Sequence, residues 1–252
     1  MKTEVIGYKG VVGGATYELM KRLGYEVTGS DKGDIINKAD VYLVCVPEDN
    51  IEEPIAWLSE NEELGDEPSG LTVVRSTTPP GTIKKMMVKY NRHVCHWPEH
   101  LREATALWDC YFPSFISIGE CCELHGAFLS SILRPIGMPI LRSDVTTSEA
   151  TKYAVNCFKC LIISFWNEFY GLSQKIDFNP HIAARIAAHD HVVPTYGTIL
   201  GKAYGGRCLP KDMGTLIKAC REVGYEPKLL LAVEEVNNRI REEYGESTIK
   251  TG

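Results

Sequence analysis

Several features are missing from this sequence of 252 residues, and each absence argues against a class of protein. No apolar stretch approaches the length that crosses a membrane, and the start of the chain reads as a short strand rather than a signal sequence. The formal net charge is -6 and no basic run is present, which argues against a nucleic-acid surface. Internal repeats and low-complexity tracts are absent too. We therefore expect a cytoplasmic globular protein with no membrane partner and no nucleic-acid partner.

Cysteines are plentiful, but their pattern does not predict a metal site. The chain has nine cysteines, an odd number, and they do not form the paired C-x-x-C motifs of zinc proteins. Cys121 and Cys122 are adjacent, while Cys157 and Cys160 lie three apart in a run with helical character. Without an export signal, free thiols are expected rather than disulfides. The sequence therefore predicts no bound metal.

The first part of the chain has the pattern of a dinucleotide-binding unit. A short apolar strand at residues 4–6 leads into glycines 7, 10 and 13, then a helical run at 15–23 and a second strand at 25–31. Small residues let the backbone amides at a helix start reach a pyrophosphate. Asp31, at the end of the second strand, can accept both ribose hydroxyls and would repel a 2′-phosphate, so NAD is expected rather than NADP. The residues predicted to bind the cofactor through this turn are Gly7, Gly10, Val11, Val12, Gly13 and Asp31.

Further strands extend this unit into an open parallel sheet. The apolar run at 39–47 is typical of a buried parallel strand, another strand is expected at 71–76, and shorter strands are expected at 93–96 and 115–118. Ligands of open parallel sheets bind beyond the carboxyl ends of the strands. Pro47, Thr77 and Glu99 lie at such ends, so we expect them to line one cleft. Each of them alone is equally compatible with ordinary turn chemistry.

The second part of the chain is helical. Residues 147–171 form an apolar stripe at helical spacing, and shorter helices are expected at 181–188 and 229–241. Lys152 and Asn156 lie four residues apart and share a different face of the long helix. A lysine and an asparagine on one face can hold a substrate oxygen and a catalytic water. A solvated lysine beside a surface asparagine is the alternative.

A cysteine near the C-terminal end has the surroundings of an activated nucleophile. Cys208 stands between two glycines and a Leu-Pro-Lys-Asp run that opens a helical segment. The helix dipole and the neighbouring Lys211 both favour the thiolate, which is the reactive form. A buried, inert cysteine before an ordinary helix cap is the alternative.

Five segments, in order along the chain, resemble motifs of the UDP-glucose/GDP-mannose dehydrogenase family. They are RSTTPPGT at 75–82, PEHLREA at 98–104 followed by Asp109 and Pro113-Ser114, EATKYAVN at 149–156, ISFWNE at 163–168, and YGGRCLPKD at 204–212. The resemblance implies an NAD-dependent, four-electron oxidation of a sugar primary alcohol to a carboxylate. It also implies a nucleotide-sugar substrate, UDP- or GDP-linked, and a Rossmann domain followed by an all-α domain like that of 6-phosphogluconate dehydrogenase.

The resemblance also implies roles for single residues. Cys208 would attack the aldehyde intermediate, Glu99 would serve as acid and base in thioester hydrolysis, and Lys152 would stabilise the oxyanion. Asn156, Thr77 and Asp212 would position the water. The resemblance adds Pro47, Thr77, Glu103 and Lys211 to the cofactor side of the site, and Glu99, Leu101, Lys152, Asn156, Tyr204 and Gly205 to the substrate side.

The expected organisation is an NAD-binding Rossmann domain at 1–142, a helical domain at 143–241 and a polar tail at 242–252. Family members carry a third domain that this sequence is expected to lack. The wide apolar face of the long helix predicts a homodimer through that helix. Two other functions remain open: a two-domain β-hydroxyacid-type dehydrogenase, and a dinucleotide-binding protein without activity. The former needs no nucleophilic cysteine, which makes it the weaker alternative.

Overall fold

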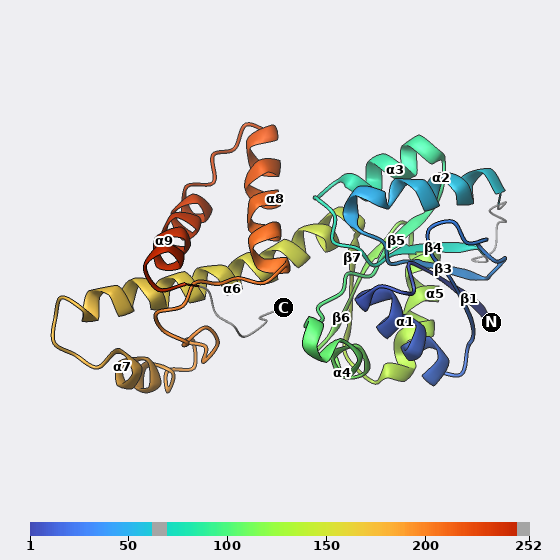
Figure 1. Cartoon of the computed structure of the whole chain (residues 1–252). Coiled ribbons are helices and arrows are strands. Elements are labelled where there is room, and N and C mark those ends of the chain that lie inside the picture. Colours follow the sequence, from blue (N-terminus) through green and yellow to red (C-terminus); the bar gives the residue numbers. More distant parts are fainter. Residues whose placement is uncertain (62–69, 246–252) are drawn as a thin grey trace. The chain divides into compact units, whose positions relative to one another are not determined.

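A computed structural model describes residues 1–61 and 70–245, and the chain forms two compact units, Met1–Lys152 and Tyr153–Gly252 (Figure 1). The first unit is α/β and the second is helical. The boundary lies inside one long helix, α6 (Val145–Ser173), which begins in the first unit and continues into the second. The predicted domain limits place this boundary ten residues earlier, before that helix begins.

The first unit is built on a seven-stranded sheet with the order β2-β1-β3-β4-β5-β6-β7. Neighbouring strands from β2 to β5 are parallel, as the sequence predicts for the nucleotide-binding pattern. β3 and β4 are buried on both faces, which explains why their sequences are mostly apolar. The strands are β1 (Lys2–Ile6), β2 (Glu26–Ser30), β3 (Val41–Val44), β4 (Leu71–Val74), β5 (Val94–His96), β6 (Ile116–Glu120) and β7 (Ile140–Asp144).

One pair of neighbouring strands in the described part of the sheet is antiparallel. β6 pairs antiparallel with β5, with His96 opposite Gly119, whereas β6 and β7 are parallel to each other over five residue pairs. The sequence did not lead us to expect β7 or this antiparallel step. β7 has exposed or half-buried residues along its length, so it lacks the apolar run that marked the inner strands.

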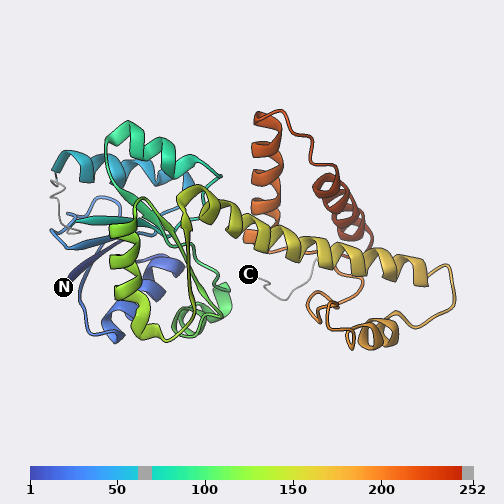
Figure 2. The same cartoon turned by 180° about the vertical axis from the view of Figure 1, so that it is seen from behind.

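Helices cover both faces of the sheet (Figures 1 and 2). One apolar cluster lies between the sheet and helices α1, α4 and α5, and includes Val5, Leu19, Cys110 and Leu129. The opposite cluster lies under α2 and α3, and includes Tyr42, Ile55 and Ile83. The helical elements of this unit are α1 (Val11–Arg22), η1 (Glu48–Asn50), α2 (Glu52–Asn61), α3 (Thr82–Tyr90), η2 (Glu103–Thr105), α4 (Ala106–Tyr111), α5 (Glu123–Leu133) and η3 (Arg134–Ile136), the three η elements being single turns of 3₁₀ helix.

The second unit packs three helices on α6. They are α7 (Pro180–Ala187), α8 (Cys208–Glu222) and α9 (Lys228–Tyr244). Cys157, Cys160 and Ile163 of α6 contact Met213 of α8 and Val233 of α9 in one apolar cluster. Ile162 and Trp166 of α6 pack with Ala184 of α7 in a second cluster.

Two helix boundaries differ from the sequence predictions, and some helices were not predicted. α1 begins at Val11 and not at residue 15, because Gly13 packs directly on the turn before it and draws the poor helix formers Val11 to Gly14 into the helix. The helices α3 and α5 were not predicted. α9 continues to Tyr244, so the first three residues of the predicted polar tail are helical, and its residues 246–252 lie outside the described part of the chain.

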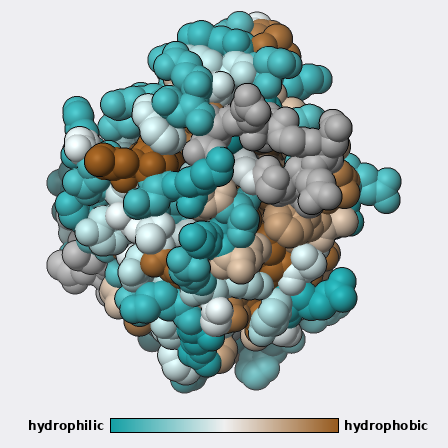
Figure 3. Space-filling model, turned by 90° about the vertical axis from the view of Figure 1, so that its right-hand side faces the viewer, coloured by the Kyte–Doolittle hydropathy of each residue, from teal (hydrophilic) through white to brown (hydrophobic). Residues whose placement is uncertain are grey.

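The surface of the first unit is mixed in character. In the face that Figure 3 shows, hydrophilic residues predominate and hydrophobic residues form separate patches. Within residues 1–61 and 70–245, every helix is too short or too polar to cross a membrane.

Candidate active site

The glycine turn after β1 is shaped by close packing. Gly7 has a φ of +87°, and a Cβ atom there would lie 2.7 Å from the carbonyl oxygen of Cys45. A Cβ atom at Gly13 would lie 2.0 Å from the carbonyl oxygen of Gly7. Both positions therefore exclude any side chain, and α1 can approach the strand end closely only because they are glycines.

Gly10 differs from these two glycines. It is the exposed N-cap residue of α1, with a φ of -77°, and a Cβ atom there would meet no atom closer than the carbonyl oxygen of Gly7 at 3.4 Å. Packing within the unit thus does not require glycine at this position. A ligand lying against the backbone would require it, because the first N–H groups of a helix have no partner inside the helix and attract phosphate.

Asp31 lies where a ribose ligand of a Rossmann unit is expected. It follows the last residue of β2, and its carboxylate accepts hydrogen bonds from the backbone N–H groups of Lys32 at 2.8 Å and Lys9 at 3.3 Å. The side chain is therefore held beside the glycine turn. Gly10 and the start of α1, where Val11 is exposed and Val12 half-buried, complete the group of residues predicted to bind the cofactor.

Three predicted residues follow neighbouring parallel strands. Pro47 comes after β3 and is exposed, Thr77 comes after β4 and is half-buried, and Glu99 comes after β5. The carboxyl ends of parallel strands share one edge of the sheet, so the topology brings these residues to the same edge as the glycine turn.

Glu99 forms a buried ion pair with Lys152. Oε1 of Glu99 lies 3.0 Å from Nζ of Lys152, and the two side chains are 12% and 4% exposed. Oε2 of Glu99 accepts a hydrogen bond from the N–H of Leu101 at 2.7 Å. Burial alone raises the pKa of Glu99, but the Lys152 ammonium and the Leu101 N–H outweigh burial, and the net pKa is lowered. The carboxylate is therefore ionised at neutral pH and held next to a cation.

Two acidic side chains fix the loops around this pair. Glu149, fully buried one turn before Lys152, accepts hydrogen bonds from Thr78 Oγ1 and from the backbone N–H groups of Gly81 and Ile83 at 2.7–2.9 Å. It thereby joins the start of α6 to the loop after β4. Asp109 accepts hydrogen bonds from Arg102, at 2.7–3.0 Å, and closes the loop that carries Glu99, Leu101 and the exposed Glu103.

Sequence reasoning missed two buried side chains at these strand ends. His96 Nδ1 lies 3.0 Å from Ser148 Oγ and its Nε2 lies 3.2 Å from the Ser76 carbonyl, while burial lowers its pKa to about 3 and keeps it neutral. Arg75 stacks on the Trp97 ring at 3.6 Å and donates to Thr16 Oγ1 at 2.8 Å. Both fasten the strand ends to helices. Their only signal in the sequence is a polar residue at the end of an otherwise apolar strand.

In the second unit, Cys208 is the first residue of α8, as the sequence predicts for this segment. The preceding turn reaches it through Gly206, whose φ is +75°, and the thiol is half-buried. Asn237 of α9 accepts from the N–H of Tyr204 at 2.7 Å and donates to its carbonyl at 3.1 Å. Asn167 of α6 makes the same kind of contact with the backbone of Gly201 and Lys202. These two asparagines, also missed from the sequence, hold the loop before Cys208.

A second polar pair lies on α6 and α8. Asn156 Nδ2 donates to Asp212 Oδ2 at 2.6 Å, and the other oxygen of Asp212 lies 2.9 Å from Nζ of Lys211. Asn156 and Asp212 are both buried, while Lys211 is exposed. Asp212 stands four residues after Cys208, so both side chains lie on one face of α8.

The predicted residues thus form two groups. Glu99 and Lys152 belong to the first unit, whereas Asn156, Asp212, Lys211 and Cys208 belong to the second. Lys152 and Asn156 lie on successive turns of α6. Tyr204 and Gly205, predicted to contact substrate, are both buried, and the Tyr204 ring packs in the core of the second unit.

Comparisons with known proteins find relatives in one family. The central-domain model of the UDP-glucose/GDP-mannose dehydrogenase family matches residues 146–239. The chain is 31% identical over 176 residues to a UDP-glucose 6-dehydrogenase of Bacillus subtilis, covering 67% of this chain and 40% of that protein. It is 30% identical over 179 residues to the GDP-mannose 6-dehydrogenase of Pseudomonas aeruginosa, covering 66% of this chain and 41% of that protein.

Solved structures show the same fold. The chain superimposes on a UDP-glucose dehydrogenase from Pyrobaculum islandicum with a TM-score of 0.81 at 24% identity, covering 94% of this chain and 68% of that one. The TM-score is 0.83 at 21% identity for a UDP-D-ManNAc dehydrogenase from Pyrococcus horikoshii, covering 96% and 69%. The fold is that of nucleotide-sugar dehydrogenases, a Rossmann unit followed by a helical central domain.

This chain belongs to the UDP-glucose/GDP-mannose dehydrogenase family. The matched region spans about two fifths of the length of the curated relatives.

Proposed function

We propose that the protein oxidises the primary alcohol of a UDP- or GDP-linked sugar to a carboxylate, with NAD as the hydride acceptor. The observation that carries this proposal is the pair of contacts on successive turns of α6, Glu99–Lys152 and Asn156–Asp212, together with Cys208 at the start of α8. A carboxylate, a cation, a held polar group and a thiol are the parts that oxidation through a thioester requires.

NAD, when bound at the glycine turn, supplies an acceptor for hydride in each of the two oxidation steps. In the first oxidation the substrate hydroxyl would lose its proton to Glu99, directly or through water, and Lys152 would stabilise the negative oxygen that results. Transfer of the first hydride would then give the aldehyde. Cys208, as the thiolate, would then add to the aldehyde carbon, and Lys152 would stabilise the charge that the carbonyl oxygen gains. Transfer of the second hydride would restore the carbonyl and leave a thioester on Cys208. Water, positioned by Asn156, Asp212 and Thr77, hydrolyses it to the acid and frees the thiol.

The site residues divide between cofactor and substrate. We assign Gly7, Gly10, Gly13 and the start of α1 to the pyrophosphate, and Asp31 to the ribose hydroxyls. Pro47, Thr77 and Glu103 complete the cofactor side, and Leu101 the substrate side. Lys211 contributes positive charge beside Cys208. Because Tyr204 and Gly205 are buried, we assign them to holding the cysteine loop and not to touching the sugar.

We also propose a homodimer through α6. Phe158, Phe165 and Leu172 recur at intervals of seven residues along this helix, and they are 57%, 56% and 45% exposed. Large apolar side chains in a stripe are typical of a subunit interface. Sedimentation of the wild type as a dimer, and of Phe165→Glu as a monomer, would support this. A monomeric wild type at micromolar concentration would contradict it.

The test of the proposed reaction is NADH formation with a panel of UDP- and GDP-sugars. The wild type is compared with Cys208→Ser, and with Cys220→Ser as a matched cysteine variant on the same helix. We expect the wild type and Cys220→Ser to form the sugar acid. Cys208→Ser is expected to stop before the acid, because serine lacks a comparably nucleophilic thiolate.

NAD binding, measured by calorimetry on the same samples, separates the possible failures. Binding without NADH formation from any sugar would favour a dinucleotide-binding protein without activity. Acid formation by Cys208→Ser at the wild-type rate would remove the thioester route and favour a dehydrogenase that needs no cysteine.

A further inference from the structure

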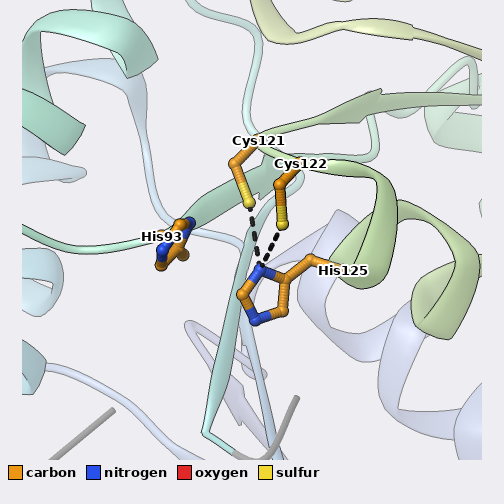
Figure 4. A group of neighbouring side chains, drawn as sticks. All are labelled: His93, Cys121, Cys122 and His125. Carbon is orange, nitrogen blue, oxygen red and sulfur yellow. Dashed lines mark hydrogen bonds between the residues drawn. The ribbon is translucent and has the colours of Figure 1, made fainter. Parts of the chain in front are cut away.

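Four side chains with metal-binding atoms meet in the first unit, away from the residues assigned to the active site. They are His93, Cys121, Cys122 and His125, and one ligand atom from each lies within 4.8 Å of the others (Figure 4). His93 is exposed, the two cysteines are half-buried and His125 is buried. The group therefore has both an interior anchor and an open side through which an ion can enter.

Local structure explains how residues from separate segments converge. His93 directly precedes β5, and Cys121 and Cys122 form the bend between the end of β6 and the start of α5. Successive side chains in a straight strand point to opposite faces, but the bend turns both thiols toward His125, the third residue of α5. Cys121 Sγ lies 3.4 Å from His125 Nδ1, and Cys122 Sγ lies 3.1 Å from the same nitrogen.

These separations resemble the edges of a metal-centred tetrahedron. With ordinary zinc–sulfur and zinc–nitrogen bonds, sulfur and nitrogen ligands stand about 3.5 Å apart and two sulfurs about 3.8 Å apart. The two sulfur–nitrogen distances are close to this value. The ring centroids of His93 and His125 are 4.8 Å apart, and His93 is exposed, so its ring has room to turn a nitrogen toward the fourth position.

Hydrogen bonding alone accounts poorly for the arrangement. Both thiols approach a single nitrogen, and thiols are weak donors and weak acceptors. One imidazole nitrogen cannot satisfy two such partners well. A cation between the sulfurs and the rings would interact favourably with all four groups at once.

We propose that His93, Cys121, Cys122 and His125 bind one zinc ion. Each thiol loses its proton to solvent as its zinc–sulfur bond forms, and the imidazoles bind through neutral nitrogens. Two sulfurs and two nitrogens in a tetrahedron favour zinc over harder cations such as magnesium. With four protein ligands the ion has no open position, so the site is structural and not catalytic.

At this position, the ion would cross-link two parts of the sheet. β5 and β6 pair antiparallel at His96 and Gly119, the one change of direction among the described strand pairs. His93 directly precedes β5, on one side of this antiparallel pairing, and the other three ligands lie on the other side, between the end of β6 and α5. Zinc would link the two sides and so stabilise the joining of the last two strands to the parallel part of the sheet.

The first test is metal content. The untagged chain is purified with a phosphine reductant. The reductant is needed because the sulfurs of Cys121 and Cys95 lie 3.8 Å apart and must be kept reduced. The chain is then equilibrated with zinc, gel-filtered and analysed by mass spectrometry for metals. We expect about one zinc per chain in the wild type, and less than about a tenth of that in Cys122→Ser and in His93→Ala. Cys220→Ser and His181→Ala, which change the same residue types in the second unit, should retain the wild-type content.

Cobalt substitution tests the ligands directly. Cobalt(II) bound by two thiolates and two imidazoles gives intense visible bands, and we expect them in the wild type and both controls but not in the two ligand variants. His93 is exposed, so His93→Ala should fold, which circular dichroism will check. Chelator should lower the melting temperature of the wild type and leave that of His93→Ala unchanged. A wild type that retains no zinc, or ligand variants that retain as much as the controls, would overturn the proposal.

Discussion

Nζ of Lys152 and Oε1 of Glu99 lie 3.0 Å apart in an environment where both side chains are nearly withdrawn from solvent. A buried ion pair of this kind depends on both partners, because either charge left alone in the interior is poorly solvated. The pair therefore joins the loop after β5 to the start of α6 and at the same time holds Glu99 in its charged form.

Replacing Lys152 by alanine should damage both stability and catalysis. The lone buried carboxylate should cost about 3 kcal/mol in the free energy of unfolding. The pKa of Glu99 should rise, because burial then acts without the ammonium that opposes it. We expect NADH formation to fall by about 10²-fold or more, as when a group that stabilises an oxyanion is removed. Urea unfolding and the pH dependence of kcat measure these effects.

The matched control for that variant is Lys84→Ala, which changes an exposed lysine on α3. It should leave stability, rate and pH profile unchanged. A Lys152→Ala protein with the pH profile of the wild type would show that Lys152 does not hold the charge of Glu99.

The cofactor preference should depend on Asp31. Its carboxylate repels a 2′-phosphate and accepts from ribose hydroxyls, so Asp31→Ser should weaken NAD binding and lessen discrimination against NADP. The ratio of the dissociation constants for NADP and NAD should fall by about tenfold or more, because hydrogen bonds to a charged acceptor are lost. Calorimetric titration with both cofactors measures it, with Asp49→Asn, an exposed acid after β3, as control. An unchanged ratio would remove Asp31 from the cofactor site.

The inner strands, the glycine turn and the long helix could be predicted because each has a local physical signature. β3 and β4 are mostly apolar and fully buried, Gly7 and Gly13 sit where no Cβ fits, and α6 carries an unbroken helical stripe. β7 is mostly exposed and has no such signature. The start of α1 was predicted too late for a related reason, since its first residues become helical only through packing on the turn.

Contacts between distant segments explain what sequence reasoning missed at the sites. Asn167 and Asn237 bind backbone groups more than 30 residues away, and no local pattern marks that role. The metal group has a partial signal, Cys121-Cys122-x-x-His125, but it lacks the usual C-x-x-C spacing. Its fourth member, His93, approaches only because β6 pairs with β5.

The loop before Cys208 should depend on Asn237. Asn237→Ala removes the acceptor and donor that bind the backbone of Tyr204. The buried N–H of Tyr204 then loses its partner, and the carbonyl keeps only the longer contact from Arg241 at 3.4 Å. We expect a loss of about 2 kcal/mol or more in the free energy of unfolding. The thiol of Cys208 should also react with iodoacetamide at a changed rate, because the loop before it is no longer held in a single conformation. The control is Glu235→Ala, which changes an exposed residue of α9, and equal alkylation rates in both variants would contradict this role.

The pH dependence of stability should carry a contribution from Glu149. Burial raises its pKa from 4.5 to about 6, although three hydrogen bonds to its oxygens oppose the shift. A carboxyl whose pKa is higher in the folded protein contributes stability that is fully present below 4.5 and is lost as pH rises through about 6. The wild type should therefore lose about 2 kcal/mol relative to Glu149→Gln across this window.

Denaturant unfolding of both proteins at several pH values, from below the lower pKa to above the higher one, measures this difference. The comparison uses the change with pH and not the absolute stabilities, because glutamine also alters the hydrogen bonds to Thr78, Gly81 and Ile83. Glu53→Gln, an exposed carboxyl on α2, is the control and should run parallel to the wild type. If the Glu149→Gln curve also runs parallel, then the three donors outweigh burial, and Glu149 is ionised throughout as a fixed anchor between α6 and the loop after β4.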